Sequence, residues 1–228
     1  MNYGPKTITN GLVLYLDAAN TKSYPGSGTT WTDLSGNNYT GTLTNGPTYS
    51  TTNLGNIVFD GVDDYVVWNS LVWDFNNPFT VSFWFYMNSL GGVDGWGFFF
   101  CGTTSSNTNR AQIGGNPDGS IYVNTVASTV GDSYQSSAGV VTTGNWYNFT
   151  TTRISNTVTV YINGNSVVSG AVNYSPSLPS NLYMGFLRSS GALRYMNGKM
   201  ANTLIYNRGL STAEVLRNYN ATKRRFGL

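Results

Sequence analysis

Three of the chain's ten carboxylates lie within five residues, in the segment FDGVDDYVVW at residues 59–68. Asp60, Asp63 and Asp64 together suit a hard cation such as calcium, which takes carboxylate and turn-carbonyl oxygens as ligands. Their spacing does not match an EF-hand loop, and no bidentate Glu follows them. The same segment also suits a tight strand-to-strand turn, in which Gly61 takes a positive φ and the carboxylates of Asp60 and Asp63 accept backbone N–H groups. Both interpretations stay open: a structural calcium site, or an acidic turn that needs no cofactor.

Few other side chains in the sequence could support catalysis. The chain has no histidine, which excludes imidazole bases and Ser-His-Asp triads. Glu214 is the single glutamate, whereas most glycosidases need two carboxylates on opposite sides of the scissile bond. Cys101 is the single cysteine, so neither an intrachain disulfide nor a cysteine zinc cluster can form. The composition therefore predicts a protein that is not an enzyme and that offers only oxygen ligands to a metal.

Two tryptophans lie among Gly, Asn and Asp residues, at the expected edges of loops. They are Trp73 in LVWDFNNP and Trp96 in GGVDGWGF, and Asp94 immediately precedes the second segment's Gly-Trp pair. An aromatic face beside amides and carboxylates suits a sugar ring, which offers apolar C–H patches and hydroxyl groups. Trp73, Trp96 and Asp94 are therefore candidate glycan contacts, with a cover over the core as the alternative role of each indole.

Positive charge is concentrated at the C-terminus. Residues 1–213 hold eight Lys/Arg against nine Asp, whereas residues 214–228 hold four Lys/Arg against Glu214. We expect the basic tail either to complete the preceding helix through its dipole or to dock on an acidic partner surface. Three adjacent cations without interleaved aromatics make a poor specific site for nucleic acid. The candidate docking residues are Arg217, Lys223, Arg224, Arg225 and Phe226.

The docking hypothesis predicts that truncation after Asn220 leaves a folded protein that attaches poorly to its partner. Three other arginines are interpreted as solvated or turn-bonding charges: Arg153 in RISN, and Arg188 and Arg194 in FLRSSGALRY.

The elements that must position these residues follow an all-β pattern. Apolar and polar residues alternate in PFTVSFWFYMN (78–88), GNWYNFTTTRIS (144–155) and TVTVYIN (157–163), among other segments. Asn163-Gly164 predicts a two-residue hairpin turn, because both positions favour a positive φ. One helix is expected over residues 211–221, with a Ser211/Glu214 capping box and a hydrophobic staple of Leu210 and Val215. We predict a single domain with two packed antiparallel sheets.

Targeting and membrane segments are not apparent in the sequence. The run GLVLYLDAA is short, contains Asp17 and lacks a basic leader, so we interpret it as a strand and not as a signal peptide. No run approaches the roughly 18 apolar residues of a membrane span. We therefore expect no membrane insertion.

An ordered set of segments resembles a known family. The chain contains, in order, GLVLYLDAANTKSYPGSGTTWTDLSGNNYTGTLTNGPTY, IVFDGVDDYV, FTVSFWFYMN, NWYNFTTTR, VTVYINGN and GKMANTLIYNRGLSTAEVLRNYNATKRRFG. Together they resemble the laminin-G-like, concanavalin A-like jelly-roll domains found in tailed-phage structural proteins, over residues 11–227.

The resemblance implies an all-β, two-sheet antiparallel jelly roll over residues 11–228, which includes the C-terminal helix and basic tail and follows an extension of residues 1–10. Relatives of this kind are mostly glycan-binding or adhesive modules, and some hold a structural calcium through ligands that do not map onto this chain. A minority are glycoside hydrolases with a Glu-x-Asp-x-x-Glu strand, which this sequence lacks. The resemblance also implies core or near-core positions for Trp31, Trp84 and Trp146.

The function predicted from these observations is that of a non-enzymatic structural protein of a phage particle. It would be a capsid decoration, fibre or tail-associated protein on the virion surface, made in the host cytoplasm. Its partners would be other capsid or tail proteins and host-surface glycans, and homo-oligomerisation stays open. The alternatives are a stand-alone, extracellular lectin-like module that binds carbohydrate, and a carbohydrate-active enzyme.

Overall fold

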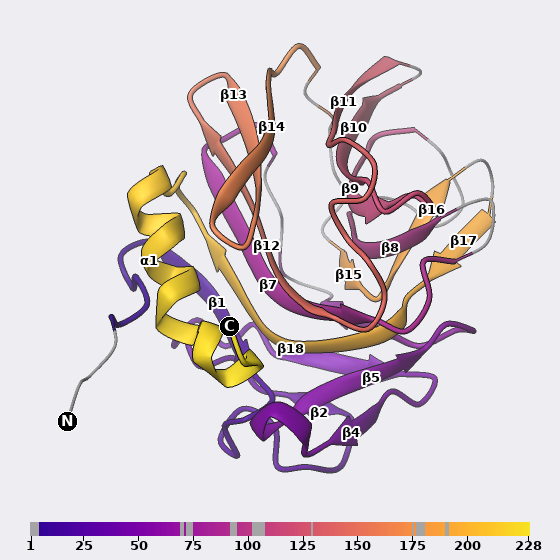
Figure 1. Ribbon diagram of the computed structural model, residues 1–228, viewed down its shortest axis with the longest axis vertical. Helices are drawn as coiled ribbons and strands as arrows, with labels where there is room; N and C mark the ends of the chain where they lie inside the picture. The colour runs from indigo at the N-terminus through magenta and orange to yellow at the C-terminus, as the bar shows by residue number, and fades with distance from the viewer. Residues whose placement is uncertain are drawn as a thin grey trace.

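The computed structural model describes residues 5–68, 71, 75–91, 95–101, 108–128, 130–174, 176, 181–189 and 192–228. Two antiparallel sheets face each other across a hydrophobic core, and one helix follows the last strand (Figure 1). The predicted fold class, a two-sheet antiparallel sandwich with a short C-terminal helix, is confirmed.

The first sheet, which we call sheet A, is built around two long strands. β18 (Asn197–Tyr206) pairs with β7 (Phe79–Met87) on one side, and on its other side with β5 (Asn56–Asp60) and β1 (Leu12–Asp17) in turn. The sheet continues beyond β5 to β4 (Thr48–Ser50). Beyond β7 it continues to β12 (Trp146–Ile154), β13 (Thr157–Ile162) and β14 (Asn165–Ala171).

The second sheet, sheet B, contains eight strands in a different order. They are, across the sheet, β11 (Val130–Gln135), β10 (Ile121–Ala127), β9 (Arg110–Gly115), β8 (Trp96–Cys101), β15 (Leu182–Met184), β6 (Tyr65–Trp68), β3 (Gly41–Thr44) and β2 (Thr30–Trp31). A separate hairpin of β16 (Phe186–Ser189) and β17 (Ala192–Tyr195) lies beside β8 (Figure 1). A short 3-10 turn, η1 (Thr52–Leu54), joins β4 to β5.

The alternation in β7 places its two faces as the sequence predicts. Phe79, Val81, Phe83 and Phe85 belong to the core between the sheets. The ring of Phe83 lies 4.9 Å from that of Phe149 on β12 and 5.0 Å from that of Phe98 on β8, so it joins the two sheets. The intervening residues lie on the outer face of sheet A, where Thr80, Ser82 and Trp84 are nevertheless buried. The predicted hairpin turn also forms, since Asn163 and Gly164 have φ angles of 52° and 79° between β13 and β14.

The helix α1 (Thr212–Thr222) begins as the sequence predicts. The Ser211 side chain accepts a hydrogen bond from the Glu214 N–H, and the Glu214 carboxylate accepts one from the Ser211 N–H, which completes a capping box. Leu210 and Val215 are both buried, in a cluster with Leu204 and Tyr206 on the outer face of sheet A. The helix therefore covers that face of sheet A (Figure 1).

The segment before β1 is tied to the same helix. The Ile8 N–H donates to Asn218 Oδ1 at 2.8 Å, and Arg217 Nε donates to the Lys6 carbonyl at 2.9 Å. The Tyr206 hydroxyl donates to the Ile8 carbonyl at 2.9 Å. Residues 6–8 thus pack beside α1 on the outer side of sheet A.

Candidate functional site

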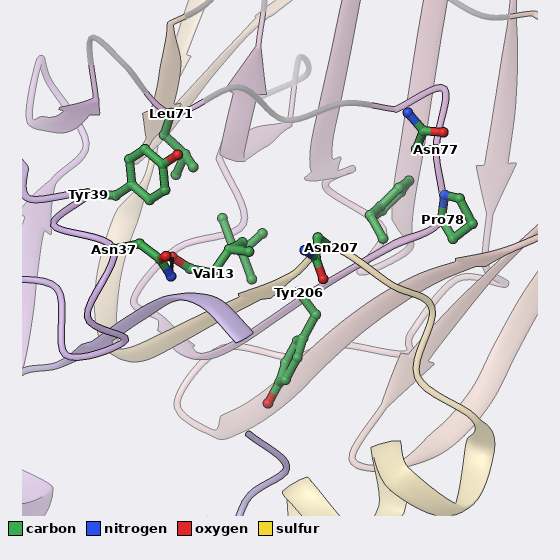
Figure 2. A pocket seen from close by; sticks show the side chains of 10 residues that line it. Val13, Asn37, Tyr39, Leu71, Asn77, Pro78, Tyr206 and Asn207 are labelled. Atoms are coloured by element: carbon green, nitrogen blue, oxygen red, sulfur yellow. Dashed lines mark hydrogen bonds between the residues drawn. The ribbon is translucent and has the colours of Figure 1, made fainter. Parts of the chain in front are cut away.

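A cavity of about 460 Å³ opens at the end of the sandwich where β7 begins and β18 ends. Its size falls within the range of about 300–1,000 Å³ that is typical of small-molecule sites. Five segments that are separate in the sequence form its wall, and Figure 2 shows side chains from each of them around the cavity. The lining residues are Val13, Asn37, Tyr39, Leu71, Asn77, Pro78, Phe79, Ile205, Tyr206 and Asn207.

The cavity has an apolar floor and an amide rim. Leu71, Phe79 and Ile205 are buried at 3–5% exposure, whereas Asn37 and Asn207 are exposed. Figure 2 shows the ring of Tyr206 pointing away from the other labelled side chains, and its hydroxyl is engaged with Ile8. Tyr206 therefore lines the cavity through its backbone. Apolar surface beneath a small number of polar groups is the usual composition of a ligand site.

The loop that carries Asn37 and Tyr39 is held in place by one buried carboxylate. Asp33 accepts hydrogen bonds from the N–H groups of Tyr15, Ser35 and Tyr39 at 2.8–3.2 Å and from the Ser35 hydroxyl at 2.7 Å. The Tyr39 carbonyl in turn accepts the Trp68 indole N–H at 2.9 Å. The loop is therefore fixed to both sheets before a ligand arrives, which lowers the entropic cost of binding.

The opposite side of the cavity is positioned by a buried arginine. Arg153 is 7% exposed, its Nη1 donates to the Phe75 carbonyl, and its Nε donates to the Ser155 carbonyl at 3.2 Å. The guanidinium carbon also lies 5.8 Å from the centre of the Phe75 ring. Arg153 thus fixes the segment that leads into β7 and that carries the lining residues Asn77 and Pro78.

The acidic segment forms a compact cluster, as the sequence predicts for either interpretation. Carboxylate oxygens of Asp60, Asp63 and Asp64 lie within 4.8 Å of one another. Asp64 Oδ2 accepts the Asp60 N–H at 2.9 Å, and Asp60 Oδ1 accepts the Val62 N–H at 2.7 Å. Gly61 has a φ of 84°, as expected for the turn. Asp60 therefore accepts a backbone N–H in the turn as predicted, whereas the second acceptor is Asp64 and not the expected Asp63.

The same cluster fits a hard cation. Burial raises the pKa of Asp64 above its usual value, and the charges of Asp60 and Asp63 add to this rise, against the hydrogen bond from the Asp60 N–H. Two of the six carboxylate oxygens accept these backbone hydrogen bonds. Bound calcium would be held by the other oxygens of the three aspartates and would neutralise their mutual repulsion.

The candidate glycan contacts chosen from the sequence are not brought together by the described part of the chain. Trp73 and Asp94 lie outside the described residues. Trp96 is 1% exposed and packs against Phe98 with 4.8 Å between ring centroids. The indole of Trp96 is therefore enclosed by the core, and it does not form the exposed glycan contact considered from the sequence. Trp31 and Trp84 are buried as the resemblance implies, and Trp146 is half-buried.

The basic tail packs on its own chain, which corrects part of the docking hypothesis. Lys223–Phe226 form a second 3-10 turn, η2, directly after α1. Phe226 is 7% exposed in a cluster with Trp84 and Ala201 on the outer face of sheet A. Because the aromatic tail residue covers apolar surface of its own domain, it does not present that ring to a partner.

The cations of the tail divide into two groups. Arg225 Nη1 forms an ion pair with Asp17 Oδ1 at 2.7 Å, and its Nε and Nη2 donate to the carbonyls of Asn53 and Gly55. Arg225 is therefore a structural residue, in contrast to the docking role expected from the sequence. Arg217 and Arg224 are exposed. Lys223 Nζ lies 5.3 Å from the centre of the Tyr219 ring.

These features define a class of protein: a two-sheet antiparallel sandwich with a ligand-sized cavity at one end. No helix among the described residues is both long and apolar enough to span a bilayer. Residues 60–216 match the family Laminin_G_3, described as the Concanavalin A-like lectin/glucanases superfamily. The match covers more than half of the chain, and the chain belongs to this family. No curated protein matches it by sequence.

Solved structures share the fold at low sequence identity. The binding domain of botulinum neurotoxin DC, in complex with rat synaptotagmin II, has a TM-score of 0.74 and 15% identity over 94% of this chain and 52% of that one. The binding domain of Paraclostridial Mosquitocidal Protein 1 has a TM-score of 0.73 and 17% identity over 93% and 52%. This chain thus spans about half the length of both domains.

A third similar structure is close to this chain in length. Domain 4 of AbnA, a GH43 extracellular arabinanase from Geobacillus stearothermophilus, in complex with arabinotriose, has a TM-score of 0.69 and 20% identity. The alignment covers 91% of this chain and 98% of that one.

Proposed function

We propose that the chain is a non-catalytic glycan-binding module whose ligand occupies the cavity between Tyr39 and Asn207. The observation that carries the proposal is the combination of an apolar floor with an amide rim in a space of ligand size. The apolar face of a sugar ring would lie on Leu71, Phe79 and Ile205, and its hydroxyls would exchange hydrogen bonds with the rim amides. Support also comes from the lectin-type family and from the similar arabinanase domain in complex with arabinotriose.

The experiment is a glycan array followed by calorimetry on the full chain. Tyr39→Ala should weaken binding of the best neutral oligosaccharide at least tenfold, because it removes an aromatic wall of the cavity. The matched control is Tyr174→Ala, since Tyr174 is an exposed tyrosine that does not line the cavity. Equal loss in both variants, or none in either, would place the ligand elsewhere. Reducing-end assays on the bound glycan should show no turnover, and turnover would reject the non-catalytic role.

The finer proposal, display on the surface of a phage particle, is carried by the ordered sequence resemblance. Exposed Arg217 and Arg224 are the tail cations that an acidic capsid or tail protein would meet. Mass spectrometry of purified particles from the source should detect the chain. Arg224→Gln should weaken its attachment at low salt, with Lys22→Gln, an exposed cation outside the tail, as the matched control.

A further inference from the structure

The outer face of sheet B carries a row of polar side chains on two neighbouring strands. In β9 and β10, Ala111, Ile113 and Val123 point into the core at 0% exposure. Because side chains alternate along a strand, Arg110 and Gln112 lie on the opposite face. Gln112 pairs directly with Asn124, and Gly114 pairs with Tyr122. Arg110, Gln112, Asn124 and Tyr122 therefore share one surface, which we call the β9–β10 face.

Three polar atoms of this face lack hydrogen-bond partners. Arg110 Nε, Gln112 Oε1 and Asn124 Oδ1 are each buried without a partner. Gln112 as a whole is 1% exposed, while Arg110 and Asn124 are half-buried beside it. Within the described residues, no ion pair joins Arg110 to a carboxylate. Since native proteins satisfy the great majority of buried polar atoms, three neighbouring exceptions indicate groups that a ligand completes.

The β16–β17 hairpin forms a wall along this face. Leu187 lies directly over two glycines of the underlying strands. A Cβ on Gly97 would lie 2.2 Å from the Leu187 nitrogen, and one on Gly114 would lie 2.3 Å from Leu187 Cδ2. The hairpin can approach the sheet this closely only because both positions are glycine. The next residue, Arg188, thereby comes near Arg110.

The electrostatics of the face favour an anion. Desolvation lowers the pKa of the Arg110 guanidinium, and the positive charge of Arg188 lowers it further, against an opposing effect of Tyr122. The Arg110 guanidinium, which is partly buried and has no carboxylate partner among the described residues, is stabilised by a negative charge placed beside it. Guanidinium binds carboxylate with matched bidentate geometry. The unpartnered amide oxygens of Gln112 and Asn124 would accept hydrogen bonds from hydroxyl groups of the same ligand.

We propose that the β9–β10 face binds an acidic saccharide, with the carboxylate of a uronate or sialate residue on Arg110 and its hydroxyls on Asn124 and Gln112. The inference rests on the proposed glycan-binding function for the class of ligand, but it uses a surface separate from the cavity near Tyr39. The two sites therefore predict different ligands and respond to different substitutions.

The test compares trigalacturonate with its methyl ester by calorimetry on the full chain. Esterification retains the sugars and removes the charge, so binding of the ester should be at least tenfold weaker. Arg110→Gln should weaken trigalacturonate binding at least tenfold and leave binding of the neutral ligand unchanged. Tyr39→Ala should weaken binding of the neutral ligand and leave trigalacturonate binding unchanged. Sialyllactose against lactose repeats the comparison for a sialate.

A second variant keeps the proposal falsifiable if Arg110→Gln is unstable. Asn124→Asp places a like charge beside the ligand carboxylate and should abolish acidic-sugar binding, whereas Asn145→Asp, on an exposed loop, should not. The proposal is overturned if the ester binds equally well, if Asn124→Asp has no effect, or if inorganic sulfate competes as well as the free uronate. If Tyr39→Ala loses the neutral ligand but the tests with acidic saccharides fail, the cavity proposal stands and the β9–β10 proposal is rejected.

Discussion

The rings of Trp84 and Phe226 stack with 4.0 Å between their centroids and an interplanar angle of 17°. Trp84 lies in β7 within sheet A, and Phe226 ends the η2 turn at the C-terminus. The Tyr219 ring also stacks with Trp84, with 5.8 Å between centroids, and the Trp84 indole N–H donates to the Thr222 hydroxyl at 2.9 Å. The C-terminal segment is thus an integral part of the fold.

Replacement of Phe226 by alanine should lower the free energy of unfolding by about 3 kcal/mol, the lower end of the range for buried aromatic side chains. Urea titration followed by tryptophan fluorescence would measure it. Leu228→Ala is the control, because Leu228 is 49% exposed and its loss should change stability by less than about 0.5 kcal/mol. Equal stability of both variants would show that the ring adds nothing.

Truncation after Asn220 should destabilise the chain strongly, in contrast to the folded product expected from the sequence. It removes Phe226 together with Arg225, whose ion pair with Asp17 and hydrogen bonds to residues 53 and 55 hold the tail on the sheet edge. We expect a large drop in melting temperature by calorimetry. A truncated protein that melts like the full chain would restore the docking role of the tail.

Acid should weaken the start of α1. Hydrogen bonds from Arg208, and from Ser211, lower the pKa of Glu214 from 4.5 to about 2. A carboxylate with a depressed folded-state pKa contributes stability above its unfolded pKa, and this contribution is lost as the pH falls through the folded pKa. The stability difference between wild type and Glu214→Gln should therefore shrink between pH 4.5 and about 2. The pair is partly exposed, so the effect should be at most about 1 kcal/mol. A constant difference would argue against the ion pair.

Asp33→Ala should impair glycan binding although Asp33 does not line the cavity. It removes the acceptor of four hydrogen bonds that shape the loop of Asn37 and Tyr39. We expect a stability loss of about 2–3 kcal/mol, from the buried N–H groups left unsatisfied, and weaker binding of the neutral ligand in calorimetry. Binding of trigalacturonate should stay unchanged at a temperature where the variant is folded. Unchanged neutral binding would mean that the loop is not part of the site.

Calcium should raise the melting temperature of the wild-type chain if the acidic cluster holds this ion, which is one of the two interpretations that the sequence left open. Asp63→Asn should remove this response, because it takes a carboxylate from the cluster and leaves the turn-capping bonds of Asp60 and Asp64 in place. Magnesium, which demands stricter geometry, should have less effect. No calcium response in the wild type would leave the cluster as a structural turn.

Local signals predicted the fold well. The alternation of β7, the Asn163-Gly164 turn and the Ser211/Glu214 capping box each involve residues close in sequence, and each forms as expected. The shortest strands, such as β2 with two residues and β15 with three, carry too few side chains for a period to be recognised. Their conformation is set by partners across the sheet.

The candidate sites were less predictable because they depend on long-range packing. The acidic cluster is contiguous in sequence, and its proximity follows from the turn. The cavity, in contrast, joins Asn37, Leu71, Asn77 and Asn207 from separate segments, and no spacing indicates that they meet. Arg194, interpreted as a solvated or turn-bonding charge, is 9% exposed, since the hairpin that carries it folds onto sheet B.

The segments at both ends of the described chain, α1 with η2 and residues 6–8, pack on the outer side of sheet A (Figure 1). Their position determines how the domain is oriented relative to anything joined to either end. Both described ends of the chain leave from that side, while the β9–β10 face belongs to the opposite sheet. A support joined at either end, whether another domain, a particle or a sensor surface, would therefore stand behind sheet A. The β9–β10 face would look away from that support, toward whatever approaches it.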